Sequence, residues 1–140
     1  MMITPYEIVS KSALPALRAM VARRLRDEYG MTQQQIAACL GVTQASISNY
    51  ARRTRGMMVN LESDSTVSSA ADKIARELSS NYSDQRESLR LMTEVLDYIR
   101  FSHMMCELHS ELEPEFQVEG CYACDGGLSA RDFGRLRAPA

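Results

Sequence analysis

Aromatic residues are scarce in this sequence of 140 residues, which has no tryptophan, six tyrosines and three phenylalanines. Glycine and proline are also few, at seven and four, and they fall between the periodic apolar segments. Apolar residues nevertheless make up 45% of the chain, which is enough for a real core. A core with so few aromatic side chains favours an all-α fold over a β-sandwich.

Long apolar runs are absent as well. No stretch approaches the roughly 18 apolar residues that a membrane-spanning helix requires, and the N-terminus lacks the apolar core of a signal peptide. We therefore expect a cytoplasmic protein with no membrane partner. The sequence also lacks a Ser-His-Asp set, a phosphate-binding loop and paired carboxylates in an apolar setting. These absences argue against an enzyme, and no small-molecule substrate is evident.

Residues 32–50 have the pattern of two short helices joined by a tight turn. Ile36, Ala37 and Leu40 share one apolar helical face, and Ile47 and Tyr50 form the next. Ala37 is small, as required where two helices cross steeply at a short turn. The pattern predicts a pair of helices that pack closely against each other.

The turn between these helices has its own sequence signals. Gly41 lies where the first helix must end, because glycine adopts the left-handed conformation of a helix end at the least steric cost. Thr43 follows as an N-cap for the second helix. Both signals place the start of the second helix at about residue 44.

The side chains left facing outward on the second helix are small or polar, which suits hydrogen bonding to the edges of DNA bases. They are Thr43, Gln44, Ala45, Ser48, Asn49 and Arg52. Gln44 is the best candidate for bidentate reading of adenine, and Asn49 is the next. Ser46 and Arg53 are predicted to hold phosphates and so to position the helix.

With a small residue at Ala37 and a turn glycine at Gly41, residues 15–56 resemble the archaeal and bacterial Xre-like (Cro/repressor-type) helix-turn-helix family. The residues in the apolar core slots of that family are Ile36, Val42, Ile47 and Tyr50. The resemblance implies that the helix at about residues 44–52 enters the major groove of double-stranded DNA. The alternative is an αα-hairpin with an ordinary packing role.

The two parts of the chain differ in charge. Residues 1–56 hold eight Lys and Arg against three acidic residues, a net charge of +5, whereas residues 57–140 hold eight against fifteen, a net charge of −7. The basic part contains the helix-turn-helix, as expected for binding a polyanion. Its basic residues are Arg52, Arg53 and Arg55 after the second helix, and Arg18, Arg23, Arg24 and Arg26 on the outer face of an earlier helix.

Apolar periodicity predicts further helices on both sides of this motif. Their expected ranges are 5–12, 15–29, 66–78 and 84–111. The last one carries an apolar stripe of Leu89, Met92, Leu96 and Ile99. We expect this stripe to form a homodimer, because helix-turn-helix proteins usually read two half-sites about 34 Å apart. The alternative is a helix packed within its own bundle.

Four cysteines in a cytosolic chain favour metal ligation or redox chemistry over structural disulfides. Cys106-x2-His109 and Cys121-x2-Cys124 together supply three thiolates and one imidazole, which suit a closed tetrahedral zinc site. An iron–sulfur cluster or a thiol switch is the alternative metal or redox interpretation. A further alternative is that Cys106 is an ordinary buried apolar residue and that the chain has no metal site. His103, one turn before Cys106, is a substitute ligand.

The sequence therefore predicts an all-α, sequence-specific DNA-binding transcriptional regulator. It would have a Cro/repressor-like helix-turn-helix domain, a C-terminal helical extension and a Cys/His metal-knuckle-like segment. The expected parts are 1–56 for DNA binding, 57–113 for a linker and a dimerising extension, 114–127 for the knuckle and 128–140 for a disordered tail. A redox-sensing regulator and an antitoxin or adaptor-type protein-interaction module are the alternatives.

Overall fold

The structure, a computed structural model, describes residues 2–52, 61–81 and 83–125. Every regular element in these ranges is helical, so the predicted all-α class is confirmed for this part of the chain. The helices are α1 (Pro5–Ile8), the π-helical turn η1 (Val9–Ala13), α2 (Leu14–Asp27), α3 (Gln33–Leu40), α4 (Gln44–Arg52), α5 (Ser65–Ser80), α6 (Arg86–Phe101) and α7 (Cys106–Leu112). None of these helices is long and apolar enough to cross a membrane.

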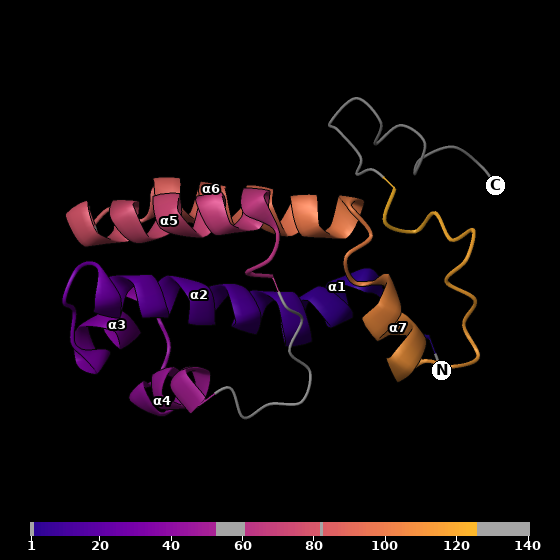
Figure 1. Cartoon of the computed structure of the whole chain (residues 1–140), viewed down its shortest axis with the longest axis horizontal. Coiled ribbons are helices and arrows are strands. Elements are labelled where there is room, and N and C mark those ends of the chain that lie inside the picture. Colours follow the sequence, from indigo (N-terminus) through magenta and orange to yellow (C-terminus); the bar gives the residue numbers. More distant parts are fainter. Residues whose placement is uncertain (1, 53–60, 82, 126–140) are drawn as a thin grey trace, which may run out of the picture.

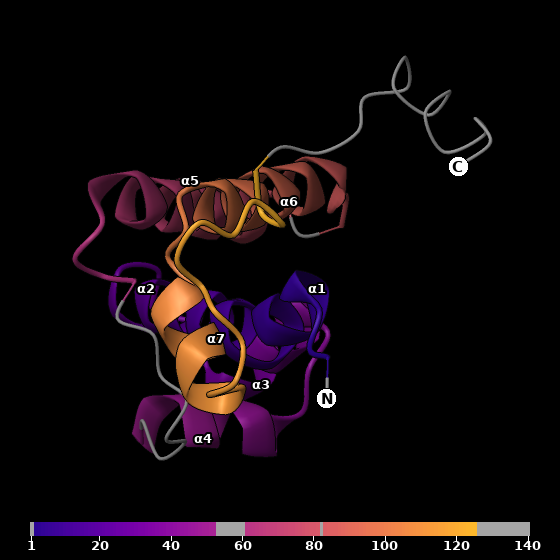
Figure 2. The same ribbon diagram turned by 90° about the vertical axis from the view of Figure 1, so that its right-hand side faces the viewer.

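The helices lie in layers around α2 (Figures 1 and 2). α5 and α6 lie side by side on one side of α2, and α3 and α4 lie on the other. α7 lies at the end of the molecule near the N-terminus and contacts α1, whereas α3 lies near the opposite end of α2. The helix-turn-helix and the α7 end are therefore far apart.

One apolar core joins these layers. α2 contributes Leu17, Val21 and Leu25, all fully buried, and packs against both α4 and α5. Ile47 of α4 and Ile74 of α5 belong to the same buried cluster. The helical extension therefore shares its core with the helix-turn-helix instead of packing separately.

The N-terminal segment is one helical run where the sequence indicated two helices. α1 begins with a capping box in which Thr4 and Glu7 bond each other's backbone N–H. The run then widens into η1, where the Leu14 N–H bonds the Val9 carbonyl. Pro15 explains the wider turn, because proline has no N–H and its ring crowds the carbonyl four residues earlier.

The helix expected over residues 84–111 is broken. α6 ends at Phe101, and a turn over residues 102–105 separates it from α7. His103 in this turn has a φ of +60°, a left-handed conformation in which histidine is several-fold enriched. The spacing of three or four residues that ends at Ile99 continues to His103 and Cys106, so it gave no sign of the break. Within the stripe, Ile99 is fully buried whereas Leu89 is 59% exposed.

Two arginines of α2 bind the start of α5 and the residues before it. The Arg24 guanidinium pairs with Glu62 at 3.2 Å and with Asp72, and it donates to the Ser68 hydroxyl at 3.0 Å. Arg23 also pairs with Glu62, at 3.1 Å. Burial alone would raise the pKa of Glu62, but the hydrogen bonds from these arginines outweigh it and hold the pKa below its ordinary value of 4.5. Arg23 and Arg24 therefore hold the fold together instead of facing outward as the sequence indicated.

Candidate nucleic-acid interface and cysteine cluster

The first helix of the motif is fixed at both ends by local bonds. At its start, Thr32 and Gln35 form a capping box, with the Gln35 N–H donating to Thr32 Oγ1 at 3.2 Å. At its end, Gly41 adopts a φ of +66°, the left-handed conformation that the sequence predicted. The Val42 N–H then donates to the Ala37 carbonyl at 3.0 Å, which closes the helix end. The turn that aims α4 is thus set by its own sequence.

The second helix starts with the N-cap that the sequence predicted. Thr43 Oγ1 accepts the Ser46 N–H at 3.1 Å and lies 3.0 Å from the Ser46 hydroxyl. Ile47, only 5% exposed, anchors the helix in the core. The Ser46 hydroxyl is thus engaged within the cap of α4 itself.

Most of the predicted contact residues lie on α4, and among those whose side chains the structure describes, the exposed ones lie at or just before its start. Thr43, Gln44 and Ala45 are exposed, and Ser46 and Ser48 are partly buried. Asn49 and Arg52 belong to α4, but the structure does not describe their side chains, and Arg53 lies outside the described residues. Their contacts with DNA stay predictions. In the structure, α4 lies on the side of α2 away from α5 and α6 (Figure 1).

The positive charge of this part is distributed unevenly. Arg23 and Arg24 are engaged in the ion pairs described above, and Arg26 pairs with its neighbour Asp27 at 2.7 Å. A second group of cations was predicted to contact phosphates after the recognition helix. This group was predicted as Arg52, Arg53 and Arg55, and its side chains lie outside the part of the chain that the structure describes.

Together, α3, the turn at Gly41 and α4 form a helix-turn-helix. Residues 23–56 match the family model described as helix-turn-helix, an Xre/Cro-like family. Over these residues the chain carries a helix-turn-helix like that of Xre-like transcriptional regulators, which bind double-stranded DNA. Neither the curated proteins nor the solved structures gave a match to the chain.

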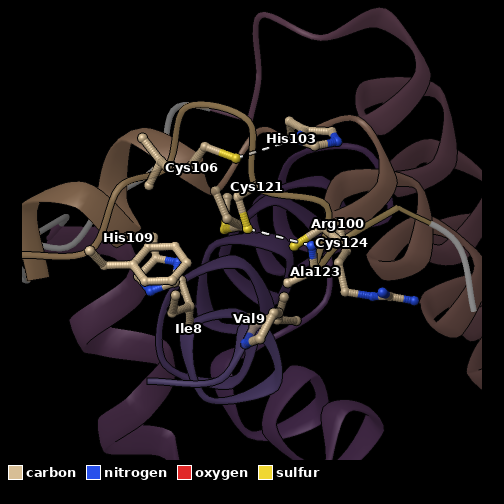
Figure 3. A pocket seen from close by; sticks show the side chains of 13 residues that line it. Ile8, Val9, Arg100, His103, Cys106, His109, Cys121, Ala123 and Cys124 are labelled. Carbon is tan, nitrogen blue, oxygen red and sulfur yellow. Dashed lines mark hydrogen bonds between the residues drawn. The ribbon is translucent and has the colours of Figure 1, made fainter. Parts of the chain in front are cut away.

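The cysteine cluster lies at the end of the molecule that carries α7 (Figure 1), and Figure 3 shows its side chains from close by. Cys106, Cys121 and Cys124 all line one pocket between the N-terminal helix, the turn before α7 and the segment that follows it. None of these three thiols forms a disulfide. The pocket has a volume of about 20 Å³, room for little more than one water-sized particle.

The predicted imidazole ligand of this cluster, His109, is engaged elsewhere. Its ring stacks on Phe116 with 4.3 Å between the centroids, and its Nε2 lies 3.2 Å from Glu113 Oε1. The side chain is buried, with only 8% of the residue exposed. His109 therefore has packing and hydrogen-bond partners of its own, although it also lines the pocket.

His103 is the histidine that contacts a thiol. Its Nδ1 lies 3.5 Å from Cys106 Sγ, and its Nε2 is hydrogen-bonded to the Asp125 carboxylate. The sequence predicted His103 as a substitute ligand, one turn before Cys106. Asp125, directly after Cys124, was not recognised from the sequence.

The thiols are held in a partly buried setting. Burial, the neighbouring Cys121 thiol and Asp125 raise the pKa of Cys106, and burial and Cys106 raise that of Cys124. As the side chains stand, no three His, Cys, Asp or Glu residues within 2–52, 61–81 and 83–125 are arranged to hold a metal ion. The predicted zinc and iron–sulfur sites stay hypotheses at this point.

Proposed function

We propose that this protein is a sequence-specific transcriptional regulator whose helix α4 enters the major groove of duplex DNA. The observation that carries the proposal is the exposed polar start of α4 on an Xre-like helix-turn-helix. The N-terminal residues of a recognition helix are the ones that reach base edges. They lie here on the side of α2 opposite α5 and α6, so the extension does not cover them (Figure 1).

Each part of α4 has a separate role in this proposal. Gln44 reads an adenine with its amide, and Asn49 is the second base-reading residue. Arg52 and Arg53 neutralise phosphates beside the helix, and Ser46 contributes a hydroxyl there once the cap relaxes. Thr43, Ala45 and Ser48 shape the surface that meets the groove.

The first helix of the motif supports the second from outside the groove. In this class of complex the first helix crosses the DNA backbone. Gln33 and Gln34 are both exposed in the first turn of α3. Their side chains and the free N–H groups of that turn suit hydrogen bonds to phosphate oxygens.

The protein acts as a homodimer in this proposal, because two half-sites a helical turn apart need two recognition helices. Pairing must use a lateral surface, since pairing across the outermost face of α5 and α6 would point the two α4 helices in opposite directions. Leu89, exposed on α6, is the residue of the predicted apolar stripe that we test for a role in pairing. Light scattering should give twice the 15.7 kDa of one chain, and Leu89→Glu should lower it.

DNA binding is tested with duplexes selected by the protein from a randomised pool. Gln44→Ala should lose discrimination at one or two base pairs, at about 1–3 kcal/mol each. Gln117→Ala, an exposed glutamine outside the helix-turn-helix, is the matched control and should bind as the parent does. Arg53→Ala should weaken all duplexes alike and reduce the salt slope by about one. Parental binding and discrimination by both the Gln44 and the Arg53 variants would contradict the proposal.

A further inference from the structure

We propose that His103, Cys106, Cys121 and Cys124 bind one zinc ion, with Asp125 holding the histidine in place. The site would be tetrahedral and closed, with three sulfur ligands and one nitrogen ligand. It differs from the set that the sequence favoured, because His103 replaces His109.

The four ligands come together from two segments that are separate in sequence. His103 lies in the turn between α6 and α7, and Cys106 is the first residue of α7. Cys121 and Cys124 belong to the chain after α7. Figure 3 shows the three sulfur atoms directed towards the same space, with His103 beside Cys106. Three thiolates and one imidazole suit a single zinc ion.

The choice of histidine follows from the contacts of the two rings. Nδ1 of His103 faces the Cys106 sulfur at 3.5 Å, whereas Nε2 of His109 faces Glu113 and the His109 ring stacks on Phe116. Both histidines bond a carboxylate through Nε2, so the contact that separates them is the one between His103 and the Cys106 thiol. The His103 side chain is 41% exposed and that of His109 is 10% exposed, so packing confines His103 less.

The surroundings of His103 match those of metal-bound histidines. Metal-ligating histidines almost always donate their second ring N–H to a carboxylate, a carbonyl or water, which fixes the tautomer. His103 Nε2 bonds the Asp125 carboxylate, so its Nδ1 is left as the ligand atom. The geometry therefore assigns a positioning role to Asp125.

Local hydrogen bonds shape the segment that carries the other two ligands. The Cys121 N–H donates to the Val118 carbonyl at 3.1 Å, and the Ala123 N–H approaches Cys121 Sγ at 3.4 Å. The Asp125 N–H then closes a turn onto the Tyr122 carbonyl at 3.0 Å. Of these donors, the Ala123 N–H is the one that would stabilise a thiolate at Cys121, and the two turns hold the backbone around Cys121 and Cys124.

Charge balance also fits three thiolates. Zinc binding releases one proton from each of the three thiols, so the ion and its ligands carry a net charge of −1. Arg100, which is largely buried and lines the pocket, offers a positive charge beside Cys124. The ion must draw the side chains closer together than they stand, as is usual where metal binding completes the local fold.

The test uses the full-length protein, purified under reducing conditions and exposed to Zn²⁺ or Co²⁺ alone. Metal content per chain gives the stoichiometry, and X-ray absorption of the zinc-loaded parent counts sulfur and nitrogen ligands without any substitution. His103→Ala and His109→Ala are a matched pair of histidine variants. Cys106→Ser is paired with Cys39→Ser, because Cys39 is buried in α3 far from the pocket. Circular dichroism checks that each variant keeps its helices.

The expected results are one zinc per chain with three sulfur ligands, and loss of zinc in Cys106→Ser but not in Cys39→Ser. His103→Ala should weaken zinc binding by at least about 100-fold, and Asp125→Asn by about 10–100-fold. His109→Ala should change it by less than about threefold. A parent that binds no zinc, a brown iron-containing protein or a larger loss in His109→Ala than in His103→Ala would overturn the assignment. Metal content is measured without DNA, so a failure here is separate from a failure of the DNA-binding proposal.

Discussion

The two ends of the molecule present polar side chains by different means. In the helix-turn-helix, buried anchors such as Ile36 and Ile47 fix the helices, and Gln44 is aimed by the helix on which it lies. At the cysteine end, His103 and Cys121 lie in turns, where hydrogen bonds over a few residues set their positions. The position of Gln44 therefore depends on the whole core. The positions of the side chains at the cysteine end become fixed only when a metal ion binds them.

This difference concerns energy as well as geometry. Apolar burial joins α2, α4 and α5 into one cooperative unit, in which one substitution affects all the layers. Residues 113–125 form no regular element and bury little, so they can open without unfolding the rest. Substitutions of the same type in the two regions should therefore change different measurements.

Ile47→Ala should have the largest effect on stability. The side chain is 5% exposed in the core between α4 and α2, so its removal should cost about 2–4 kcal/mol of unfolding free energy and weaken DNA binding. Val118→Ala, which truncates a half-buried residue at the cysteine end, should cost less than about 1 kcal/mol. Urea unfolding measures both. Equal losses in the two variants would show that the cysteine end belongs to the same cooperative unit.

The sequence predicted the helix-turn-helix well because its signals are local. The left-handed Gly41 and the N-cap Thr43 each act over a few residues, and apolar spacing identifies the buried face of α4. The ion pairs from Arg24 to Glu62 and Asp72 bridge 38 and 48 residues, so only the folded chain reveals them.

The cysteine end was harder to predict for a different reason. The spacing of Cys and His residues identified the donor types, but not which histidine faces the thiols. That choice depends on the break after Phe101, where His103 takes a left-handed conformation that the apolar pattern does not show. The stacking of His109 on Phe116 likewise depends on how residues 113–118 fold back on α7.

Two glycines allow a closer comparison of the ends. Gly41 and Gly120 have φ values of +66° and +75°, and a methyl group added at either would meet no atom within 4 Å. Alanine at each position should therefore cost about 1–2 kcal/mol through backbone conformation alone. In Gly41→Ala this cost should appear as lower global stability. In Gly120→Ala it should appear as roughly 5–30-fold weaker zinc binding with unchanged urea unfolding. Loss of global stability in Gly120→Ala would contradict local opening of that segment.

Glu62→Gln should have the smallest effect, and it should depend on pH. Because Arg24 and Arg23 hold the pKa of Glu62 below its ordinary value of 4.5, ionised Glu62 stabilises the fold above that value. The contribution disappears as the pH falls through the lowered pKa. Its carboxylate is 40% exposed, so solvent screening limits the loss at pH 7 to about 0.5–1 kcal/mol. Urea unfolding at pH 7 should resolve this difference, and the unfolding free energies of the variant and the parent should become equal in acid.

The control is Glu119→Gln, which replaces an exposed acidic residue at the cysteine end. Its unfolding free energy should match that of the parent both at pH 7 and in acid. A constant gap between Glu62→Gln and the parent at every pH would show that the side chain acts through packing instead of charge.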